Sequence, residues 1–187
     1  DLVDASIPQY LTSDADDHQR LLDLLQSGHY DICLNAVVGA AGLPFSEAVL
    51  SAGCDLALAN KESLVMAGSI LMSLASSNSA TIVPVDSEHS AIFQCLVGET
   101  APIKQLLLTA SGGALRDMPL ADLATATTAQ ALAHPNWDMG PRITIDSATM
   151  MNKAFEIIEA HCLFGVSAEQ IKVFIHRQSV IHSMVEF

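Results

Sequence analysis

The chain has 187 residues, half of them hydrophobic, and its 8 basic and 21 acidic residues give a net charge of −13. This length suffices for a hydrophobic core, in one large domain or in parts of two neighbouring domains. The acidic balance argues against a nucleic-acid partner, because phosphate backbones are bound by clustered Lys and Arg. A small anionic ligand remains compatible, since backbone amides and one or two cations can hold a phosphate within an acidic protein.

The four cysteines, Cys33, Cys54, Cys95 and Cys162, lie far apart in the sequence. Their separation excludes a zinc ribbon or a CxxC redox motif. Each is surrounded by apolar residues, which predicts buried, reduced thiols in a cytoplasmic protein rather than disulfides.

The apolar run at residues 64–74 is too short for a membrane span, and Gly68 and two serines interrupt it. We therefore expect a buried helix there and no membrane association. The chain begins with Asp1 rather than Met and ends at Phe187 within a strand-like run. From these ends we expect an internal fragment of a longer protein.

Strands and helices are predicted to alternate along the first half of the chain, after an irregular lead-in. The elements expected here are, in order, lead-in 1–15, helix 16–26, buried strand 30–38, helix 46–52, buried strand 56–59, helix 60–76 and strand 81–85. Continuous apolar runs between helices are typical of strands in a parallel sheet, so the sequence predicts an α/β fold. In such folds ligands bind at the carboxyl ends of the strands.

The second half mixes short strands, helices and a loop rich in proline and glycine. The elements expected here are, in order, helix 90–96, strand 105–109, one or two short surface helices within 119–132, loop 134–141, strand 142–145, helix 149–163 and strands 172–175 and 179–187.

Two carboxylates, Asp86 and Glu88, follow the strand expected at residues 81–85. Side chains two residues apart in an extended segment face the same way, so these carboxylates would repel each other unless a cation lay between them. Hard divalent cations such as Mg²⁺ or Mn²⁺ prefer such oxygen ligands. The pair by itself is a weak signal, and a solvated acidic loop is an equal alternative.

A second polar stretch places hydroxyl, amide, ammonium and carboxylate groups at an expected helix start. Asn152 and Glu156 share a helix face, with Lys153 on an adjacent one, and either Ser147 or Thr149 is expected to cap the helix. Free N–H groups at a helix start favour phosphate, and Glu156 would add a third carboxylate to the acidic pair. The spacing also fits an ordinary amphipathic helix in which Lys153 and Glu156 form a surface pair.

We expect the two polar stretches to meet and to build one site, with a metal at one end and a phosphate at the other. Ser111 precedes two glycines at a strand end, where backbone can approach an anion, although such a sequence is often only a turn. In the Pro/Gly loop, His134 is a candidate phosphate ligand or a structural residue, and Trp137 would shield the site from water. Lys61 would bind a substrate oxygen or a cofactor phosphate, unless it is a surface lysine. The other six histidines show no metal-ligand spacing and are expected to be structural or on the surface.

Six sequence blocks, taken together and in order, resemble the 1-deoxy-D-xylulose 5-phosphate reductoisomerase family. They are LANKESLV at 58–65, PVDSEHSAIFQ at 84–94, LTASGG at 108–113, HPNW at 134–137, DSATMMNK at 146–153 and QSVIHSMV at 178–185. Several long blocks in register are far more specific than any one of them, and the resemblance extends from about residue 30 to the end of the chain.

The resemblance implies a reaction and an architecture. Members of the family convert 1-deoxy-D-xylulose 5-phosphate into 2-C-methyl-D-erythritol 4-phosphate, in the non-mevalonate route to isoprenoids, with NADPH and a divalent metal (Mn²⁺, Mg²⁺ or Co²⁺). The metal chelates the substrate's carbonyl and hydroxyl oxygens, the carbon skeleton rearranges by retro-aldol cleavage and re-aldolisation, and hydride from NADPH reduces the resulting aldehyde. The implied architecture is the C-terminal part of a Rossmann-like NADPH-binding domain (1–85), then an α/β catalytic domain with a mixed sheet that binds metal and substrate (86–187), in a cytoplasmic homodimer.

The resemblance also implies roles for individual residues. The implied metal ligands are Asp86, Glu88 and Glu156. The implied catalytic residues are Lys61, Glu88 and His134. The implied phosphosugar-binding residues are Lys61, Ser87, Glu88, Ser111, His134, Trp137, Ser147, Asn152, Lys153 and Glu156. The implied NADPH contacts are Asn60, Glu62 and Gly140.

The chain departs from the family pattern in several places. The family's Gly-rich dinucleotide fingerprint would precede Asp1, and its C-terminal helical domain would follow Phe187. Ala154, Arg177 and the pair 114–115 replace the usual Gly, Pro and Pro-Phe, and none of them is an implied ligand. Two alternatives stay open: a fragment that binds metal and phosphosugar without turnover, or another NADPH-dependent phosphosugar oxidoreductase.

Overall fold

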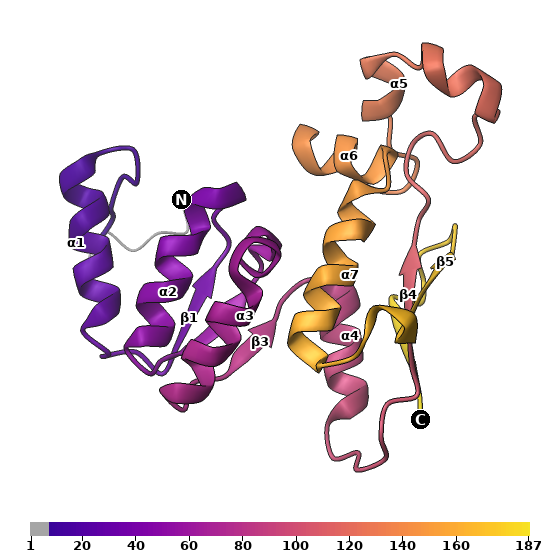
Figure 1. Cartoon of the computed structure of the whole chain (residues 1–187). Helices are drawn as coiled ribbons and strands as arrows, with labels where there is room; N and C mark the ends of the chain where they lie inside the picture. Colours follow the sequence, from indigo (N-terminus) through magenta and orange to yellow (C-terminus); the bar gives the residue numbers. More distant parts are fainter. Residues whose placement is uncertain (1–7) are drawn as a thin grey trace.

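A computed structural model describes residues 8–187, which form two α/β units with one three-stranded sheet each (Figure 1). In the first unit, β1 (Ile32–Asn35), β2 (Asp55–Leu58) and β3 (Ile82–Pro84) lie side by side in that order, and both strand pairs are parallel. The predicted α/β fold is thereby confirmed. Residues 1–7, part of the expected lead-in, lie outside the described residues.

The helices of the first unit are α1 (Ala15–Gln26), the 3-10 turn η1 (Gly39–Gly42), α2 (Leu43–Ser51) and α3 (Lys61–Ser77). Their starts follow from local chemistry. Asp14 caps α1 by accepting from two backbone N–H groups, Pro44 lies in the first turn of α2, and Asn60 caps α3 by accepting from the N–H of Ser63 at 3.2 Å. Leucines from α2, α3 and β2 form the core between the sheet and the helices.

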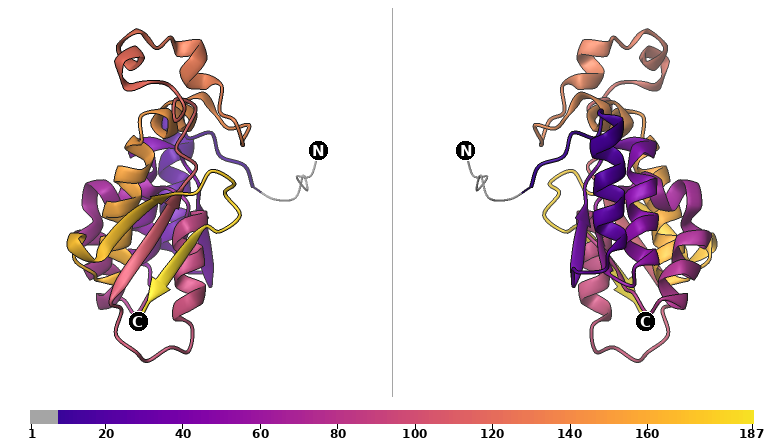
Figure 2. Two further views of the ribbon diagram at one scale, coloured as in Figure 1. Left: turned by 90° about the vertical axis from the view of Figure 1, so that its right-hand side faces the viewer. Right: turned by 90° about the vertical axis from the view of Figure 1, so that its left-hand side faces the viewer.

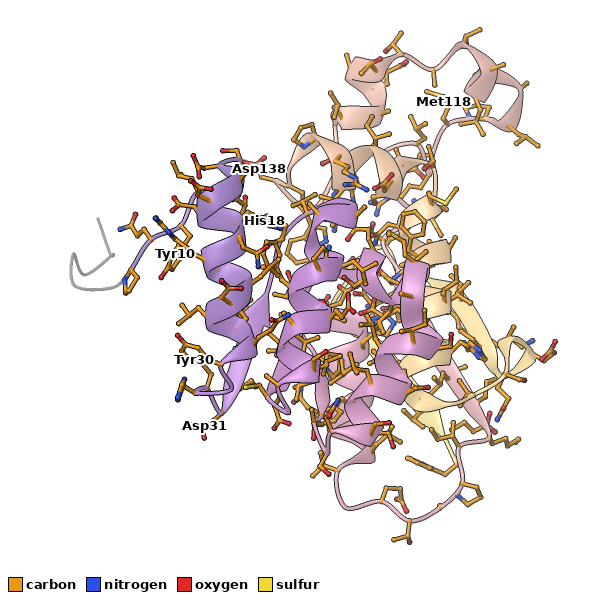
Figure 3. The ribbon with its side chains drawn as sticks, turned by 60° about the vertical axis from the view of Figure 1, so that its left-hand side comes forward. Tyr10, His18, Tyr30, Asp31, Met118 and Asp138 are labelled. Atoms are coloured by element: carbon orange, nitrogen blue, oxygen red, sulfur yellow. The ribbon has the colours of Figure 1, made fainter. Side chains whose placement is uncertain are left out.

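The strand predicted to be buried at residues 30–38 is instead a short edge strand. Ile32 is 54% exposed and Leu34 is 67% exposed, whereas Asn35 on the opposite face is buried. Side chains alternate along a strand, so β1 presents its two large apolar residues to a face that nothing within residues 8–187 covers. Tyr30, just before β1, lies at the outer side of this unit (Figure 3).

The second unit contains a mixed sheet, as expected. Its elements are α4 (Ser87–Leu96), β4 (Gln105–Ala110), η2 (Leu120–Thr125), α5 (Thr128–Leu132), α6 (Pro141–Ala148), α7 (Met151–Phe164), η3 (Ala168–Gln170), β5 (Ile171–Ile175) and β6 (Ser183–Glu186). Strand β4 lies in the middle, parallel to β5 and antiparallel to β6 (Figure 2). Helices α4 and α7 lie on one face of this sheet, and the segment that carries Met118 extends beyond it (Figures 1 and 3).

The strand predicted at residues 142–145 is wrong, because these residues lie in α6. Their β-branched pattern favoured a strand, but Pro141 occupies the first turn of a helix, where its fixed φ is favourable. The helix predicted from residue 149 begins at Met151, after Met150 in the left-handed conformation. The predicted caps are wrong as well, since Ser147 lies in α6 and Thr149 ends that helix.

Two smaller predictions hold only in part. The strand predicted at 179–187 is confirmed for its second half, because Ser179 has a positive φ of 50° and belongs to a turn. All four cysteines are free, as predicted, but only Cys54 is buried, because Cys33 and Cys162 are half-buried and Cys95 is exposed. No helix of the described chain is long and apolar enough to cross a membrane.

Helices α3 and α7 pack directly against each other and join the two units. A side chain at Gly68 would overlap Cys162 Sγ, so the glycine permits this close approach. The contact brings the start of α3, at the carboxyl end of β2, next to the start of α7.

We keep residue 85 as the proposed domain boundary, since β3 ends at Pro84 and α4 begins at Ser87.

Candidate metal and substrate site

Three carboxylates converge where the two units meet. Asp86 directly precedes α4, Glu88 lies in the first turn of that helix, and Glu156 lies in the second turn of α7. Each offers one oxygen, and these oxygens lie within 4.8 Å of one another. The premise of an extended Asp86–Glu88 segment is wrong, because the turn from β3 into α4 and the approach of α7 bring the carboxylates together.

Lys61 crosses from the first unit into this cluster. Its Nζ donates to Asp86 Oδ2 at 2.5 Å, to Asn152 Oδ1 at 3.0 Å and to Glu156 Oε1 at 3.3 Å. The side chain is buried at the start of α3, so the surface-lysine alternative is excluded. Burial alone would lower the pKa of Lys61, but the charges of Asp86 and Glu156 outweigh it and raise the pKa well above its ordinary value.

Lys153 enters the cluster from α7. It donates to Glu88 Oε1 at 3.2 Å and to the Thr109 carbonyl at 2.5 Å, and it forms an ion pair with Glu156 Oε2. The alternative of a surface Lys153–Glu156 pair is wrong, because the two residues are only 6% and 1% exposed. Both lysines therefore neutralise carboxylates that burial would otherwise destabilise.

A second buried group, His89 with Glu159, lies behind these carboxylates and was missed from the sequence. His89 Nε2 lies 2.8 Å from the Glu156 carbonyl, and its Nδ1 lies 3.4 Å from Glu159 Oε2 and 3.7 Å from Asp86 Oδ2. Burial raises the pKa of Glu159 to about 7, while the charge of His89 opposes that rise. Burial also raises the pKa of Glu156, with the charges of Asp86 and Glu88 adding to it. The spacing of Glu156 and Glu159, three residues apart on one helix face, could have signalled this group.

A cavity of about 380 Å³ opens beside the cluster, within the usual size of a small-molecule site. It is lined by every implied phosphosugar-binding residue except Lys61, which lies behind Asp86. These are Ser87, Glu88, Ser111, His134, Trp137, Ser147, Asn152, Lys153 and Glu156. Asp86 also lines it, and an apolar wall that the sequence did not indicate comes from Met139, Ile143, Met150 and Ile181.

His134 and Ser111 meet at the far side of the cavity. His134 Nε2 lies 3.0 Å from Ser111 Oγ, and His134 Nδ1 accepts from the backbone N–H groups of Asn136, at 3.2 Å, and Trp137, at 2.9 Å. An Nδ1 that accepts cannot hold a proton, so the neutral ring has its proton on Nε2, which donates to Ser111. Burial lowers the pKa of His134, and the charge of Arg116 lowers it further.

The glycine pair after β4 sets the distance between the cavity's two sides. Gly112 and Gly113 have φ values of 88° and 73°, which favour glycine. A Cβ on Gly113 would overlap the Ser147 carbonyl, so the turn packs tightly on the end of α6. This contact places Ser111 and Ser147 on adjacent walls of the same cavity.

The implied NADPH contacts lie outside the cavity, at the carboxyl edge of the first sheet. Asn60 is buried, and its amide group donates to the carbonyls of Val37, at 2.5 Å, and Gly39, at 2.9 Å. Glu62 lies 3.3 Å from Arg142 Nη2, and residue 140 precedes α6. Because the side chain of Asn60 already holds the η1 loop, a contact from it to a cofactor would have to come from its backbone; the assignment of these residues to NADPH stays a prediction.

The donor set fits a hard divalent cation. All three carboxylates offer oxygen ligands that lie within 4.8 Å of one another, and the Glu156 carboxylate is 1% exposed and neutralised by the two lysines. Mg²⁺ and Mn²⁺ are bound by such oxygens, whereas this cluster offers no thiolate. Asp86, Glu88 and Glu156 are therefore the residues that could hold the metal, with both lysines close enough to adjust the charge.

Fold and site together define an α/β protein in which two sheets meet at an acidic cluster beside a polar cavity. A family model described as 1-deoxy-D-xylulose 5-phosphate reductoisomerase matches residues 6–68, and the model of the C-terminal domain of the same family matches residues 82–164. The chain belongs to the 1-deoxy-D-xylulose 5-phosphate reductoisomerase family.

Individual relatives agree with this family. The 1-deoxy-D-xylulose 5-phosphate reductoisomerase of Bacteroides fragilis is 55% identical over 168 residues, which are 89% of this chain and 43% of the relative. A crystal structure of DOX-P reductoisomerase in complex with NADPH, fosmidomycin and magnesium superposes with a TM-score of 0.84 at 46% identity, over 90% of this chain and 44% of the other. The enzyme from Zymomonas mobilis in complex with NADPH gives a TM-score of 0.80 at 43% identity, over 90% and 43% of the two chains. The chain thus spans less than half the length of these relatives.

Proposed function

We propose that this chain forms the metal- and substrate-binding core of an enzyme that converts 1-deoxy-D-xylulose 5-phosphate into 2-C-methyl-D-erythritol 4-phosphate. The reaction depends on NADPH and a divalent metal and belongs to the non-mevalonate route to isoprenoids. The proposal concerns the whole enzyme, because the chain covers 43% of the relative from Bacteroides fragilis.

One observation supports this proposal most strongly. Segments sixty or more residues apart in sequence bring Asp86, Glu88 and Glu156 to within 4.8 Å, beside a cavity whose other walls contain the implied phosphosugar-binding residues. Several polar groups from four segments therefore face one space of suitable size. An acidic loop or a surface helix pair, the alternatives left by the sequence, would not produce this arrangement.

The position of each residue in the cavity suggests which part of the substrate it would bind. Hydroxyl, amide and imidazole donors at Ser111, His134, Ser147 and Asn152 would bind the phosphate and orient the rest of the substrate. Neutral His134 donates through Nε2, so it can hydrogen-bond a phosphate oxygen without a proton change. Lys153, close to both Asn152 and the carboxylates, would stabilise negative charge between the two ends.

Two groups from outside the chain complete the proposed chemistry. When bound by Asp86, Glu88 and Glu156, a divalent cation would act as a Lewis acid on substrate oxygens. NADPH would supply hydride, and we propose that it binds along the carboxyl edge of the first sheet near Asn60, Glu62 and Gly140. The NADPH and magnesium in the similar solved structures support both assignments. Mn²⁺ and Co²⁺ are further candidates for the metal.

We also propose a cytoplasmic homodimer. Free cysteines support the location, since reduced thiols are typical of that compartment. Strands β5 and β6 expose Phe174 and Met184 on one face of the sheet, and large apolar side chains there support an interface with a second copy.

The experiment is NADPH oxidation with 1-deoxy-D-xylulose 5-phosphate and Mn²⁺, followed by absorbance. We expect substrate-dependent oxidation that falls at least about 100-fold in Glu88→Gln, because a ligand and substrate contact is lost. Glu99→Gln, on an exposed loop, is the matched control and should keep full activity.

Two results would contradict the proposal. Binding of Mn²⁺ and substrate by calorimetry without NADPH oxidation would identify a binding fragment instead. Faster turnover of another sugar phosphate in a substrate panel would identify a different oxidoreductase.

A further inference from the structure

Arg116, which the sequence did not single out, lies where three loops meet beside the cavity. Its Nη1 donates to the Ser111 carbonyl at 2.8 Å, to Asn136 Oδ1 at 3.1 Å and to the Arg177 carbonyl at 3.3 Å. These acceptors come from the turn after β4, the loop before α6 and the turn after β5. One nitrogen with two N–H groups therefore joins three segments that lie far apart in the sequence.

Two hydrogen bonds of Asn136 hold the loop before α6 at the place where Arg116 meets the turn after β5. Asn136 accepts from Arg116 and also donates through Nδ2 to the Arg177 carbonyl at 3.1 Å. The next residue, Trp137, donates its backbone N–H to His134 Nδ1 at 2.9 Å and lines the cavity. The position of Trp137 is thus fixed through the His134 ring on one side and through Arg116 and Asn136 on the other.

The stem of Arg116 is built into the fold. Its side chain is 15% exposed, and a Cβ on Gly112 would lie 3.0 Å from Arg116 Cβ and 3.2 Å from Cδ. Glycine at 112 therefore makes room for the stem beside Ile175. A surface arginine would need no such space. The packing of the stem therefore fixes the position of the guanidinium group.

The ion pair that Arg116 forms is a minor contribution. Arg116 Nε lies 3.6 Å from Asp117 Oδ2, beyond hydrogen-bond distance, and Asp117 is largely exposed and also pairs with Arg177. Exposed pairs of this kind contribute little. The hydrogen bonds from Nη1 to oxygens of three loops are the contacts that distinguish this residue, because charge-assisted bonds are stronger than neutral ones.

We propose that Arg116 is a positioning residue, which ties the Ser111 turn, the Asn136–Trp137 segment and the turn after β5 together and so keeps Trp137 as a wall of the cavity. It acts through these segments and does not touch the cavity itself. The inference rests on the proposed function only for its effect on turnover.

The chain offers a direct readout, because Trp137 is its one tryptophan. Quenching of tryptophan fluorescence by acrylamide therefore reports the exposure of this wall without substrate, metal or cofactor. Trp137 is 49% exposed, so its full release would increase quenching about twofold. In Arg116→Met, which keeps the apolar stem, we expect such an increase.

Three variants complete the test. Arg116→Lys keeps a cation with three donors and should restore part of the protection. Asn136→Ala removes the loop's side of the contact and should increase quenching as Arg116→Met does. Arg20→Met, on exposed α1, is the matched control and should leave quenching unchanged.

Unchanged quenching in a folded Arg116→Met protein would overturn the inference. If that variant does not fold, Asn136→Ala decides, because Asn136 is an exposed loop residue and its loss leaves the core intact. In the active enzyme, Arg116→Met should raise KM more than it lowers kcat, with part of the effect reversed in Arg116→Lys. Absence of turnover in the wild type would contradict the proposed function and leave the quenching result unaffected.

Discussion

The two ends of the cavity are built in different ways. At the acidic end, Lys61 and Lys153 each contact several oxygens, and the carboxylate of Glu156 between them is 1% exposed. At the Trp137 end, a loop without regular structure is held by Ser111, His134 and Arg116, and Trp137 is about half exposed.

This difference separates the kinds of force that organise the site. Buried charges that neutralise one another fix the acidic end, because moving any one of them leaves another unpaired. Hydrogen bonds from a few side chains to loop backbone fix the Trp137 end, and such segments open at low free-energy cost. We therefore expect the acidic end to be preorganised for a cation and the Trp137 end to adapt to what enters the cavity.

The largest effect should follow from Lys61→Met. Asp86 and Glu156 would stay buried without this cation, which costs about 3 to 5 kcal/mol of unfolding free energy. Mn²⁺ should restore part of the loss, since it binds only the folded cluster. Urea unfolding with and without MnCl₂ measures both effects. Lys104→Met, in an exposed pair with Glu186, is the control and should cost under about 1 kcal/mol; an equal loss in the two variants would refute the role of buried charge.

A smaller effect should follow from Gly113→Ala, which tests how the two ends are joined. Alanine at a φ of 73° costs about 1 to 2 kcal/mol, and its Cβ would also overlap the Ser147 carbonyl. Gly98→Ala is a matched control, because Gly98 has a φ of 78° and open space around its Cβ. Thermal unfolding should show the larger loss for residue 113. Equal losses would mean that the turn and α6 are not in tight contact.

The smallest effect should appear when two His134 variants at the Trp137 end are compared. Loss of the acceptor at Nδ1 should cost about 1 kcal/mol of the free energy that holds the loop in place. His134→Asn keeps an acceptor near the position of Nδ1, so Trp137 should stay protected from acrylamide. His134→Gln extends past that position toward Ser111, so the N–H groups of Asn136 and Trp137 lose their acceptor and quenching should rise. The opposite order would contradict the anchoring role of Nδ1.

The same residue predicts a pH dependence. The folded-state pKa of His134 lies below its ordinary value of 6.5, so the unfolded chain binds a proton more readily. Above pH 6.5 the ring is neutral in both states, so His134 does not change the free energy of unfolding. As the pH drops through 6.5 toward the lowered pKa, the unfolded chain gains the proton first, and stability should fall. Urea unfolding from about pH 7 to about pH 5 should show a smaller fall in His134→Asn than in the wild type. Identical slopes would show that His134 does not titrate differently in the folded state.

Much of this architecture could be predicted from the sequence, because periodic apolar runs and caps act locally. The strands at residues 56–59 and 105–109 and the helix at 60–76 are confirmed within two residues. The strand predicted at residues 142–145 is wrong, because consecutive β-branched residues favour a strand until the position of Pro141 is taken into account. The exposure of β1 could not be predicted, since an apolar run does not reveal what covers it.

The site was predictable in its residues and less so in its contacts. The blocks that resemble the family identified most of the polar residues that line the cavity, but not its apolar wall. That Lys61 would cross between the units to Asp86 depends on how α3 packs on α7, which no local pattern encodes. Arg116 was missed for a similar reason, because its acceptors lie on three loops that are far apart in the sequence, whereas Glu159 was missed although its spacing from Glu156 could have signalled it.

We propose that Asp86, Glu88 and Glu156 form one divalent-cation site. The most direct measurement is Mn²⁺ binding followed by electron paramagnetic resonance, in the wild type, in Glu156→Gln and in the exposed control Glu169→Gln. We predict one bound Mn²⁺ in the wild type and the control, and an affinity at least about tenfold weaker in Glu156→Gln. Equal Mn²⁺ affinity in all three proteins would contradict the claim.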